Sequence, residues 1–361
     1  MVIKKVQLCN FRNIPSLCFE PDENMNIIYG ENGQGKTNIL EALWLFTGAK
    51  SFRGVRDREM VRFGEQGARI SCLFEADGTE KEAKITIKER REAEIFGKTV
   101  SRPALLAGYF YAVVFSPQDL MLVGGPPDIR RRFLDLAIGQ VTPKYIDILK
   151  SYNKAVIQRN AVLKQLREGR RVAELLEPFE IKASRAGAEL LKYRYRYCKR
   201  LNMEAPRIYS GMSGGSERLS VIYESQFLEG TTPEQLFDAF ISSRHTDMKA
   251  GTTTIGPKRD DVNILINGTA AKNYGSQGQR RSAALCLKLA QAGIMKSVSG
   301  ENPVALLDDV MSELDIKRQR FILNQLCDWQ VFLTCCDPAN TKKLKDGKIF
   351  HIREGALCTS I

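Results

Sequence analysis

The residues Gly30-Glu31-Asn32-Gly33-Gln34-Gly35-Lys36-Thr37 place three glycines before a lysine and a threonine. Glycines let the backbone curl so that successive N–H groups point at phosphate oxygens. The lysine then reaches the outer phosphates, and the hydroxyl is a ligand for Mg²⁺. The run matches the G-x-x-x-x-G-K-[ST] phosphate-binding pattern in full. We predict that residues 30–38, Asn38 included, bind ATP.

The sequence on either side of this loop supplies the elements that such a loop needs. Met25–Tyr29 is a short apolar segment typical of a buried strand, and Asn38–Phe46 has apolar residues at helical spacing. The beginning of that helix adds a partial positive charge next to the bound phosphates. A chance match to four fixed positions is the alternative, and the correct flanks argue against it.

A second acidic motif lies near the C-terminus. Val304–Leu307 is apolar and is followed by Asp308 and Asp309. A strand ending in acids carries them to the sheet edge beside a phosphate loop, which is the arrangement of a Walker B strand. We predict that Asp308 holds Mg²⁺ with Thr37, and that Asp309 polarises the attacking water. Alone this pattern is weak, because many buried strands end in aspartate.

The composition is that of an ordinary globular protein with room for two or three domains. Of 361 residues, 43% are hydrophobic and 27% charged. No apolar run is long enough to cross a bilayer and the first residues lack a signal-peptide pattern, so we expect a cytoplasmic protein. Nine scattered cysteines without a C-x-x-C pair favour buried thiols over disulfides or zinc. Two histidines, His245 and His351, argue against a histidine-based site.

The charge balance favours a polyanionic partner. Lys and Arg total 54 against 42 acids, a net charge of +12, and nucleic acid is the simplest such partner. The alternatives for each basic cluster are a solvated helix face or an internal ion-pair network. The candidate DNA-contacting residues are Arg130, Arg131, Arg132, Arg194, Arg196, Lys199, Arg200, Lys342, Lys343 and Lys345.

The remaining pattern divides the chain into a head and an arm. Alternation predicts antiparallel strands within 2–20 and 68–97, and Phe110–Phe115 is predicted as a central strand. Helical spacing dominates 128–201, with a break near Gly169 that suggests an antiparallel helical hairpin. Its aromatic residues favour helix packing over base stacking. We predict a head of residues 1–117 and 252–361, with 118–251 inserted as a mainly helical arm.

Three further motifs resemble those of the ABC-type ATPases. Ser276-Gln277-Gly278-Gln279 opens a long apolar helix and resembles the family signature, Met311–Asp315 resembles the D-loop, and Gln118 resembles the Q-loop glutamine. Walker A is separated from the signature and from Walker B by a helical insertion, as in the structural-maintenance-of-chromosomes branch. The resemblance implies an α/β fold: a P-loop ATPase head with a mixed sheet, an antiparallel β subdomain and an inserted α-helical arm.

The resemblance assigns roles to these motifs. Ser276, Gln277, Gly278 and Gln279 are implied to grip the γ-phosphate bound by a second copy, so that ATP holds a homodimer together. Gln118 is implied to contact the metal and to couple the nucleotide to the second lobe.

Six runs along the chain carry a more specific resemblance: Asn10–Asn13, Ser51–Arg53, Arg130–Asp135, Gln158–Asn160, Gly256–Asp261 and Ser276–Arg281. Together they resemble the bacterial RecF family, and the resemblance runs from the N-terminus to Asp337. It implies an ATP-driven clamp on single- and double-stranded DNA, with weak DNA-stimulated ATPase activity, which helps to load recombinase at gaps. It also implies RecR as a partner, with RecO and RecA in the same pathway.

Two departures from the ABC pattern qualify these expectations. Asp309 stands where ABC enzymes usually carry glutamate, and the shorter carboxylate fits slow hydrolysis. No switch histidine follows Val331–Cys336, where Thr334 is a possible substitute. A P-loop kinase and a transporter ATPase subunit are the alternative functions. The kinase leaves the signature unexplained, and the +12 charge and helical arm argue against the transporter.

Overall fold

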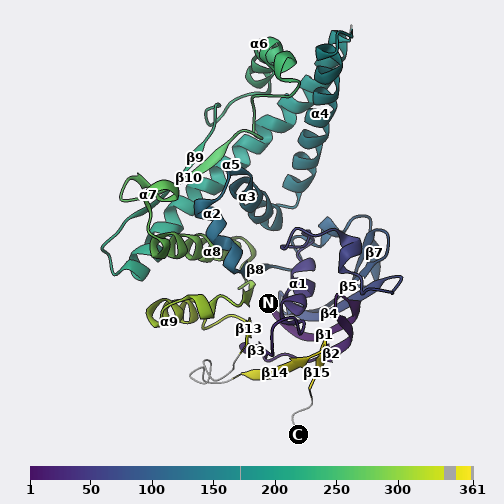
Figure 1. Cartoon of the computed structure of the whole chain (residues 1–361), viewed down its shortest axis with the longest axis vertical. Helices are drawn as coiled ribbons and strands as arrows, with labels where there is room; N and C mark the ends of the chain where they lie inside the picture. Colours follow the sequence, from purple (N-terminus) through teal and green to yellow (C-terminus); the bar gives the residue numbers. More distant parts are fainter. Residues whose placement is uncertain (171, 337–346, 359–361) are drawn as a thin grey trace. The chain divides into compact units, whose positions relative to one another are not determined.

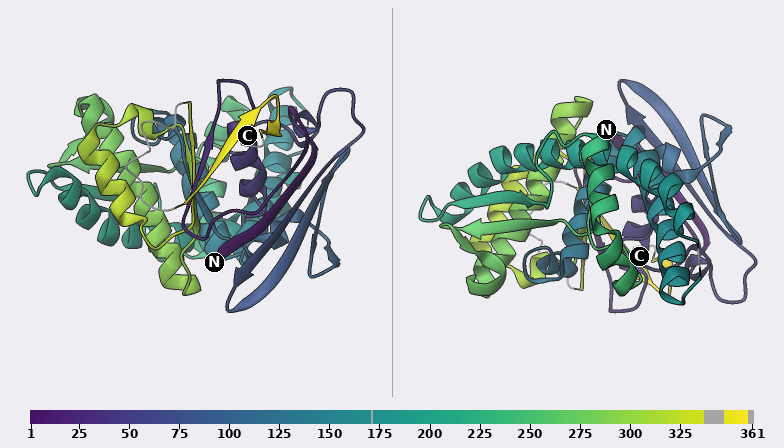
Figure 2. Two further views of the ribbon diagram at one scale, coloured as in Figure 1. Left: turned by 90° about the horizontal axis from the view of Figure 1, so that it is seen from below. Right: turned by 90° about the horizontal axis from the view of Figure 1, so that it is seen from above.

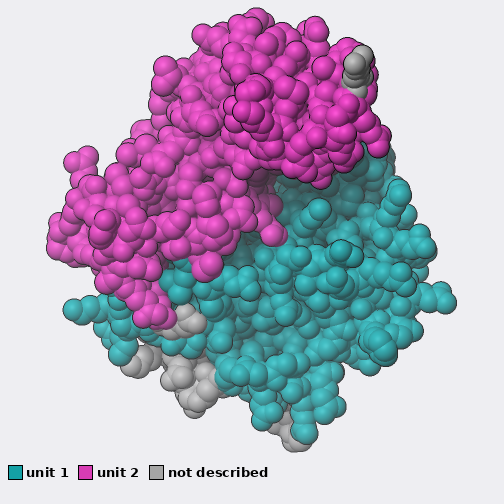
Figure 3. Space-filling model, turned by 45° about the horizontal axis from the view of Figure 1, so that its top comes forward, with its two compact units in different colours: residues 1–120, 284–361 teal, residues 121–283 magenta. Residues whose placement is uncertain are grey.

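The computed structural model describes residues 1–170, 172–336 and 347–358. The chain forms two compact units (Figure 3). Unit 1 comprises Met1–Leu120 and Ala284–Ile361, and unit 2 comprises Met121–Ala283. No helix in the described part of the chain combines the length and apolar character needed to cross a membrane.

The centre of unit 1 is a six-stranded sheet in the order β15-β14-β3-β13-β12-β8 (Figure 1). All neighbouring strands run parallel except β14 and β15. The predicted strands before the phosphate loop and before the two aspartates are confirmed as β3 and β12. The bounds are β3 Met25–Tyr29, β8 Ala112–Phe115, β12 Val304–Asp308, β13 Val331–Cys335, β14 Lys348–Arg353 and β15 Ala356–Leu357.

A second, antiparallel sheet in unit 1 has the order β2-β1-β4-β5-β6-β7. Helix α1 (Lys36–Leu45) contacts both β1 of this sheet and β12 and β13 of the parallel one (Figure 2). This arrangement explains why nearly all of α1 is buried rather than one stripe. The strands are β1 Val2–Phe11, β2 Ile14–Phe19, β4 Ala68–Ala76, β5 Thr79–Ile87, β6 Arg91–Ile95 and β7 Lys98–Val100.

Short helices complete unit 1 and lie between its strands in the sequence. η1 and η2 precede and follow the strands β4 to β7, η3 follows β8, and η5 and α9 lie between β12 and β13. Their bounds are η1 Asp57–Met60, η2 Pro103–Leu106, η3 Pro117–Asp119, η5 Met311–Glu313 and α9 Ile316–Gln325.

Unit 2 is built on two long helices, α4 (Lys144–Arg167) and α5 (Leu176–Ser213). Tyr145 contacts Tyr193, and Arg159 contacts Glu180, so residues later in α4 meet residues earlier in α5. The predicted antiparallel hairpin is therefore confirmed. Tyr145, Tyr152 and Tyr197 are buried, which confirms helix packing as the role of these aromatics.

The remaining elements of unit 2 are shorter. A three-stranded antiparallel sheet has the order β11-β10-β9. The elements are α2 Leu120–Gly124, α3 Pro127–Val141, η4 Ala173–Leu175, β9 Leu219–Glu224, α6 Pro233–Ala250, β10 Asp261–Ile266, β11 Thr269–Ala270, α7 Ala271–Tyr274 and the beginning of α8 Gln277–Ser299.

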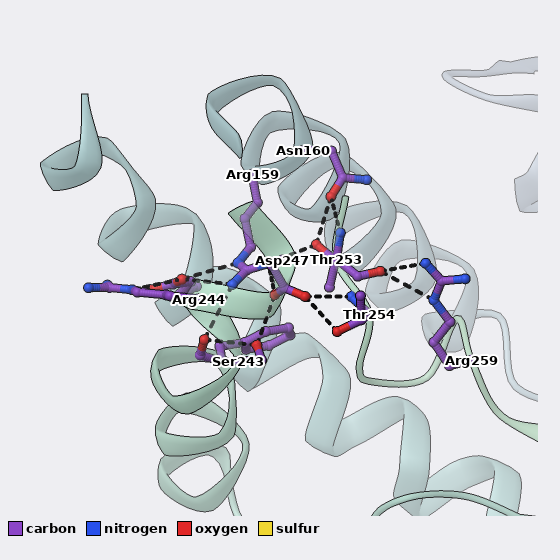
Figure 4. A network of polar contacts seen from close by, with 10 residues as sticks. Arg159, Asn160, Ser243, Arg244, Asp247, Thr253, Thr254 and Arg259 are labelled. Atoms are coloured by element: carbon purple, nitrogen blue, oxygen red, sulfur yellow. Dashed lines mark hydrogen bonds and ion pairs between the residues drawn. The ribbon is translucent and has the colours of Figure 1, made fainter. Parts of the chain in front are cut away.

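A fully buried ion-pair network joins α4, α5 and α6 (Figure 4). The Arg159 guanidinium donates to Glu180 Oε1 at 3.1 Å and to Asp247 Oδ2 at 2.6 Å. It also donates to Thr253 Oγ1 at 3.0 Å, and the backbone N–H of Thr254 donates to Asp247 Oδ1 at 2.8 Å. Buried charges need such complete pairing, so this network fixes both the helices and the segment that follows α6.

The segment after α6 explains a difference between the predicted and observed boundaries. The first predicted boundary, at 117, lies near the observed one, but residues 252–283, predicted in the head, lie in unit 2. Strand β10 pairs along its length with β9, and the Arg130 guanidinium makes two hydrogen bonds of 2.7 Å to Asp261. Arg131 donates to the carbonyl of Asp260, and Arg194 to that of Pro257.

We predict that Arg159→Met lowers the free energy of unfolding by about 3–5 kcal/mol, because it leaves Asp247 without its buried cation and Glu180 with only the partly exposed Arg244. Urea denaturation measures this change. Arg196→Met, an exposed arginine of α5, is the matched control and should change stability by less than about 0.5 kcal/mol. Equal stability of the two variants would contradict the prediction.

Candidate nucleotide-binding site

The phosphate loop runs from the end of β3 to the beginning of α1, as the sequence predicts. Gly35 has φ 113°, which favours glycine, and a Cβ there would lie 2.8 Å from Asn13 Oδ1. A Cβ on Gly30 would lie 2.2 Å from the carbonyl oxygen of Ile352 in β14. Positions 30 and 35 therefore require glycine because neighbouring atoms leave no room for a Cβ, as well as because of the turn geometry.

The ammonium of Lys36 is held inside the loop. Its Nζ donates to the carbonyl oxygens of Gly30 at 2.6 Å and Glu31 at 2.9 Å, and the side chain is only 7% exposed. Cys336, directly after β13, lies 3.7 Å from the same Nζ and donates to Asn32 Oδ1. The loop thus holds a cation in a fixed position.

The neighbouring polar residues of the loop have structural partners. Gln34 accepts hydrogen bonds from the backbone N–H groups of Glu354 and Gly355. The Asn38 side chain donates to Asn13 and accepts from Arg53. Of the predicted loop residues, those that line the adjacent cavity are Asn32, Gly33, Gly35, Lys36, Thr37 and Asn38.

Asp308 joins the two predicted halves of the site. Thr37 Oγ1 donates to Asp308 Oδ1 at 2.7 Å, and Thr334 Oγ1 donates to the same oxygen at 3.0 Å. The parallel register of β12 and β13 sets Asp308 opposite Thr334. Burial raises the pKa of Asp308, and the two hydroxyl hydrogen bonds oppose that rise.

The donor set at this point suits a magnesium ion. Mg²⁺ prefers oxygen ligands and keeps several waters, and Thr37 and Asp308 supply a hydroxyl and a carboxylate in contact. When bound, the ion supplies positive charge that offsets the charge on Asp308 and the phosphates. Gln118 lies in η3 after β8, whose Phe115 is opposite Leu307 of β12, so it belongs to the same sheet edge. Its side chain is exposed.

Asp309 is also positioned by the end of β13. Its backbone N–H donates to Thr334 Oγ1 at 3.0 Å, and its φ of 53° is a left-handed conformation rare outside glycine. Ser312 Oγ donates to the carbonyl oxygen of Asp309. Hydrogen bonds from the N–H group and to the carbonyl oxygen of Asp309 thus hold its left-handed backbone in place.

A cavity of about 1150 Å³ opens from the phosphate loop within unit 1. Asp309 and Thr334 line it, together with residues of the segment 58–66. Arg12 and Arg53 also line it, and no role was predicted for them beyond their place in family motifs. The Arg12 guanidinium makes two hydrogen bonds of 2.9 and 3.0 Å to Glu41, which is fully buried on α1.

The predicted signature residues lie in unit 2, at the beginning of α8. The backbone N–H of Gln279 donates to Ser276 Oγ at 3.2 Å, and that of Ser276 donates to Gln279 Oε1 at 2.7 Å. This reciprocal pair is a capping box, which satisfies N–H groups that a helix leaves unpaired. The Gln279 amide also donates to Glu217, and Gly278 accepts from Ser282. Gln277 is the first helical residue.

Two of the predicted DNA-contacting arginines are buried. Arg130 is 4% exposed and paired with Asp261, and Arg194 is 3% exposed and paired with Asp135. The prediction of DNA contact is wrong for these two, because their guanidinium groups serve internal ion pairs. Arg132, Arg196 and Lys199 are exposed, while Arg131 and Arg200 are half-buried. Lys342, Lys343 and Lys345 lie outside the described residues.

The parallel sheet, phosphate loop and acidic strand end define an ATPase head with the ABC-type fold. The RecF/RecN/SMC N-terminal domain family matches residues 2–353. The DNA replication and repair protein RecF of Agathobacter rectalis is 38% identical over 363 residues, which cover 98% of each chain. The chain therefore belongs to the RecF family.

Two solved structures agree with this assignment. A structure of the recombination mediator protein RecF with ATPrS, in the RecFOR pathway, is 36% identical, with a TM-score of 0.92 over 98% of this chain and 97% of that one. The corresponding structure with ATP is 35% identical, with a TM-score of 0.91 over 99% and 97% of the two chains.

We predict that Asp308→Asn abolishes ATP hydrolysis, on the order of 100-fold or more, without destabilising the nucleotide-free protein. Because the folded-state pKa is raised, the ionised carboxylate opposes folding above that pKa, and the neutral amide removes this cost.

Thermal melts at several pH values measure the effect on stability. The gain of the variant over wild type should be largest near neutral pH and should shrink as the pH falls toward the ordinary aspartate range. A variant that melts well below wild type at pH 7 would contradict the argument.

Proposed function

We propose that this protein is an ATP-dependent DNA-binding protein of recombinational repair and replication restart. In this proposal it binds ATP with Mg²⁺ and hydrolyses it slowly, as a switch. The observation that carries the proposal is the contact of Thr37 with Asp308 beside the enclosed Lys36. That junction is a metal and phosphate site, and it lies in the fold whose relatives are named for DNA replication and repair.

The chain's own residues divide the work on ATP. Lys36 and the loop N–H groups bind the β- and γ-phosphates, while Thr37, Asp308 and Gln118 hold the metal. Asp309 orients the attacking water at the turn after β12. An aspartate reaches less far than a glutamate, so hydrolysis is slow and the ATP-bound state persists.

A second copy of the chain completes each site. Ser276 and the N–H groups around Gly278 form the beginning of a 23-residue helix, where an anion is stabilised. The capping box holds these groups in place within unit 2, while the phosphate loop is in unit 1. ATP bound to one copy is then gripped by the signature residues of the other, and hydrolysis releases the dimer.

The dimer clamps DNA at gaps or single-strand/double-strand junctions and helps to load recombinase. The net charge of +12 supports binding to phosphates without sequence preference. RecR, with RecO and RecA in the same pathway, are the proposed partners, in accord with the RecFOR pathway named for the similar structures. We place this activity in the cytoplasm.

Mixing two inactive variants tests whether the site is shared. Lys36→Met and Ser276→Arg should each abolish the ATP-driven dimer in sedimentation and nearly all hydrolysis. A heterodimer of the two contains one intact site, because it combines the Lys36 of one copy with the Ser276 of the other. An equimolar mixture should therefore recover up to about a quarter of wild-type ATPase activity. The shared site would be refuted if the mixture recovered no ATPase activity and each variant alone still formed dimers.

DNA affinity should fall steeply with salt. For Arg196→Ala with Arg200→Ala, we predict weaker binding to every sequence and a slope of log affinity against log salt that is smaller by about 1 to 2. Fluorescence anisotropy with ATP on gapped, single- and double-stranded DNA measures both. Lys98→Ala, an exposed lysine of unit 1, is the control. If the slope of log affinity against log salt were near zero for the wild type, the proposal that the protein binds DNA through its phosphates would be contradicted.

A further inference from the structure

The cavity beside the phosphate loop extends to one aromatic side chain that the mechanism above leaves unused. Besides the loop, the segment 58–66 lines this cavity, and Phe63 belongs to it. Phe63 is the only aromatic residue among the described residues that line the cavity. Its side chain is fully exposed, more so than any other large apolar side chain in the described part of the chain.

Hydrogen bonds hold the backbone around Phe63 in place. The backbone N–H of Arg62 donates to the carbonyl of Asn10 at 2.9 Å, and that of Glu65 donates to the carbonyl of Arg62 at 3.0 Å. The Asn10 side chain donates to Glu65 Oε2 at 2.9 Å. Residues 62–65 thus form a β-turn with both ends pinned to β1, and Gly64 supplies the positive φ of 86° that such a turn requires.

The backbone just before the turn is fixed as well. Met60 is fully buried, and its carbonyl accepts from the N–H of Arg12 at 2.8 Å. Val61 forms an isolated β-bridge with Phe11. The ring of Phe63 is therefore presented by a rigid backbone, so a ligand that covers it does not first have to order the loop.

We infer that Phe63 stacks on the base of the nucleotide whose phosphates the loop binds. This inference rests on the proposed binding of ATP. With the phosphates at Lys36, the rest of this cavity is the adjoining space for the nucleoside, and Phe63 offers the one aromatic face among the described residues that line it. Stacking removes both the base and the ring from water, and it tolerates any base because each has a π face.

The flanking residues fit the rest of a nucleotide. Arg12, Arg53 and Arg58 line the same cavity and are cations suited to phosphate oxygens. Arg12 is held by the buried Glu41 and donates to the carbonyl of Glu59 at 3.1 Å, next to the turn. Arg58 and Phe63 thus lie on one segment, to which Arg12 is hydrogen-bonded, and this matches a ligand with a charged end and a flat apolar end.

Calorimetric titration of three probes tests the inference: ATP, ADP and inorganic tripolyphosphate. For Phe63→Ala we expect the Kd of ATP and of ADP to rise on the order of 10-fold, the usual loss for one stacked base. The Kd of tripolyphosphate should not change, because it has no base. Phe63→Trp should bind ATP as tightly as wild type or more tightly.

Phe96→Ala is the matched control, because Phe96 is an exposed phenylalanine of the same unit that does not line the cavity. Its variant should bind all three probes like wild type. ATP binding that is unchanged in Phe63→Ala would overturn the inference, and so would an equal loss for tripolyphosphate, which would mean that the phosphate loop itself is disturbed. If the wild type bound neither ATP nor tripolyphosphate, the proposed function would fail, and the inference with it.

Discussion

The hydrogen bond between Thr37 and Asp308 is the constraint around which unit 1 is arranged. A partly buried carboxylate requires donors, and Asp308 takes one hydroxyl from α1 and one from β13. These hydrogen bonds join the beginning of α1 and the end of β13 to the end of β12, where the parallel register places Thr334 opposite Asp308. The beginning of α1 at the phosphate loop and the ends of β12 and β13 therefore meet at one side chain.

Unit 2 depends on charge in a different way. Its helices are joined by buried arginines that meet carboxylates, and these arginines also hold the segment that leads to β10. Such pairs add little stability relative to apolar packing, but they tolerate few alternative arrangements. Each internal pair removes one positive and one negative charge from the surface. These pairs therefore leave the net charge of +12 unchanged, and the excess positive charge lies on groups outside them, where it attracts a polyanion.

Local sequence predicted the elements of the nucleotide site well, but it did not predict which arginines are buried in ion pairs and which are exposed. The strand, loop and helix around Lys36 and the acids after β12 follow from short-range pattern, because their chemistry is set by neighbours in the chain. Arg130, Arg131 and Arg132 are consecutive, and only the fold determines that Arg130 meets Asp261 while Arg132 is exposed. The boundary at 251 was misplaced for the same reason, since β10 pairs with a distant strand. Phe63 carried no signal, because an isolated aromatic residue is ordinarily a core residue.

The order of strands in the parallel sheet has a consequence for biosynthesis. Strand β3, which leads into the phosphate loop, has β13 and β14 as its two neighbours, and both lie far later than β3 in the sequence. A nascent polypeptide leaving the ribosome therefore has no neighbouring strands for β3 until β13 and β14 have been translated. Through that interval β3 has two open edges, which makes the growing chain a natural client for chaperones.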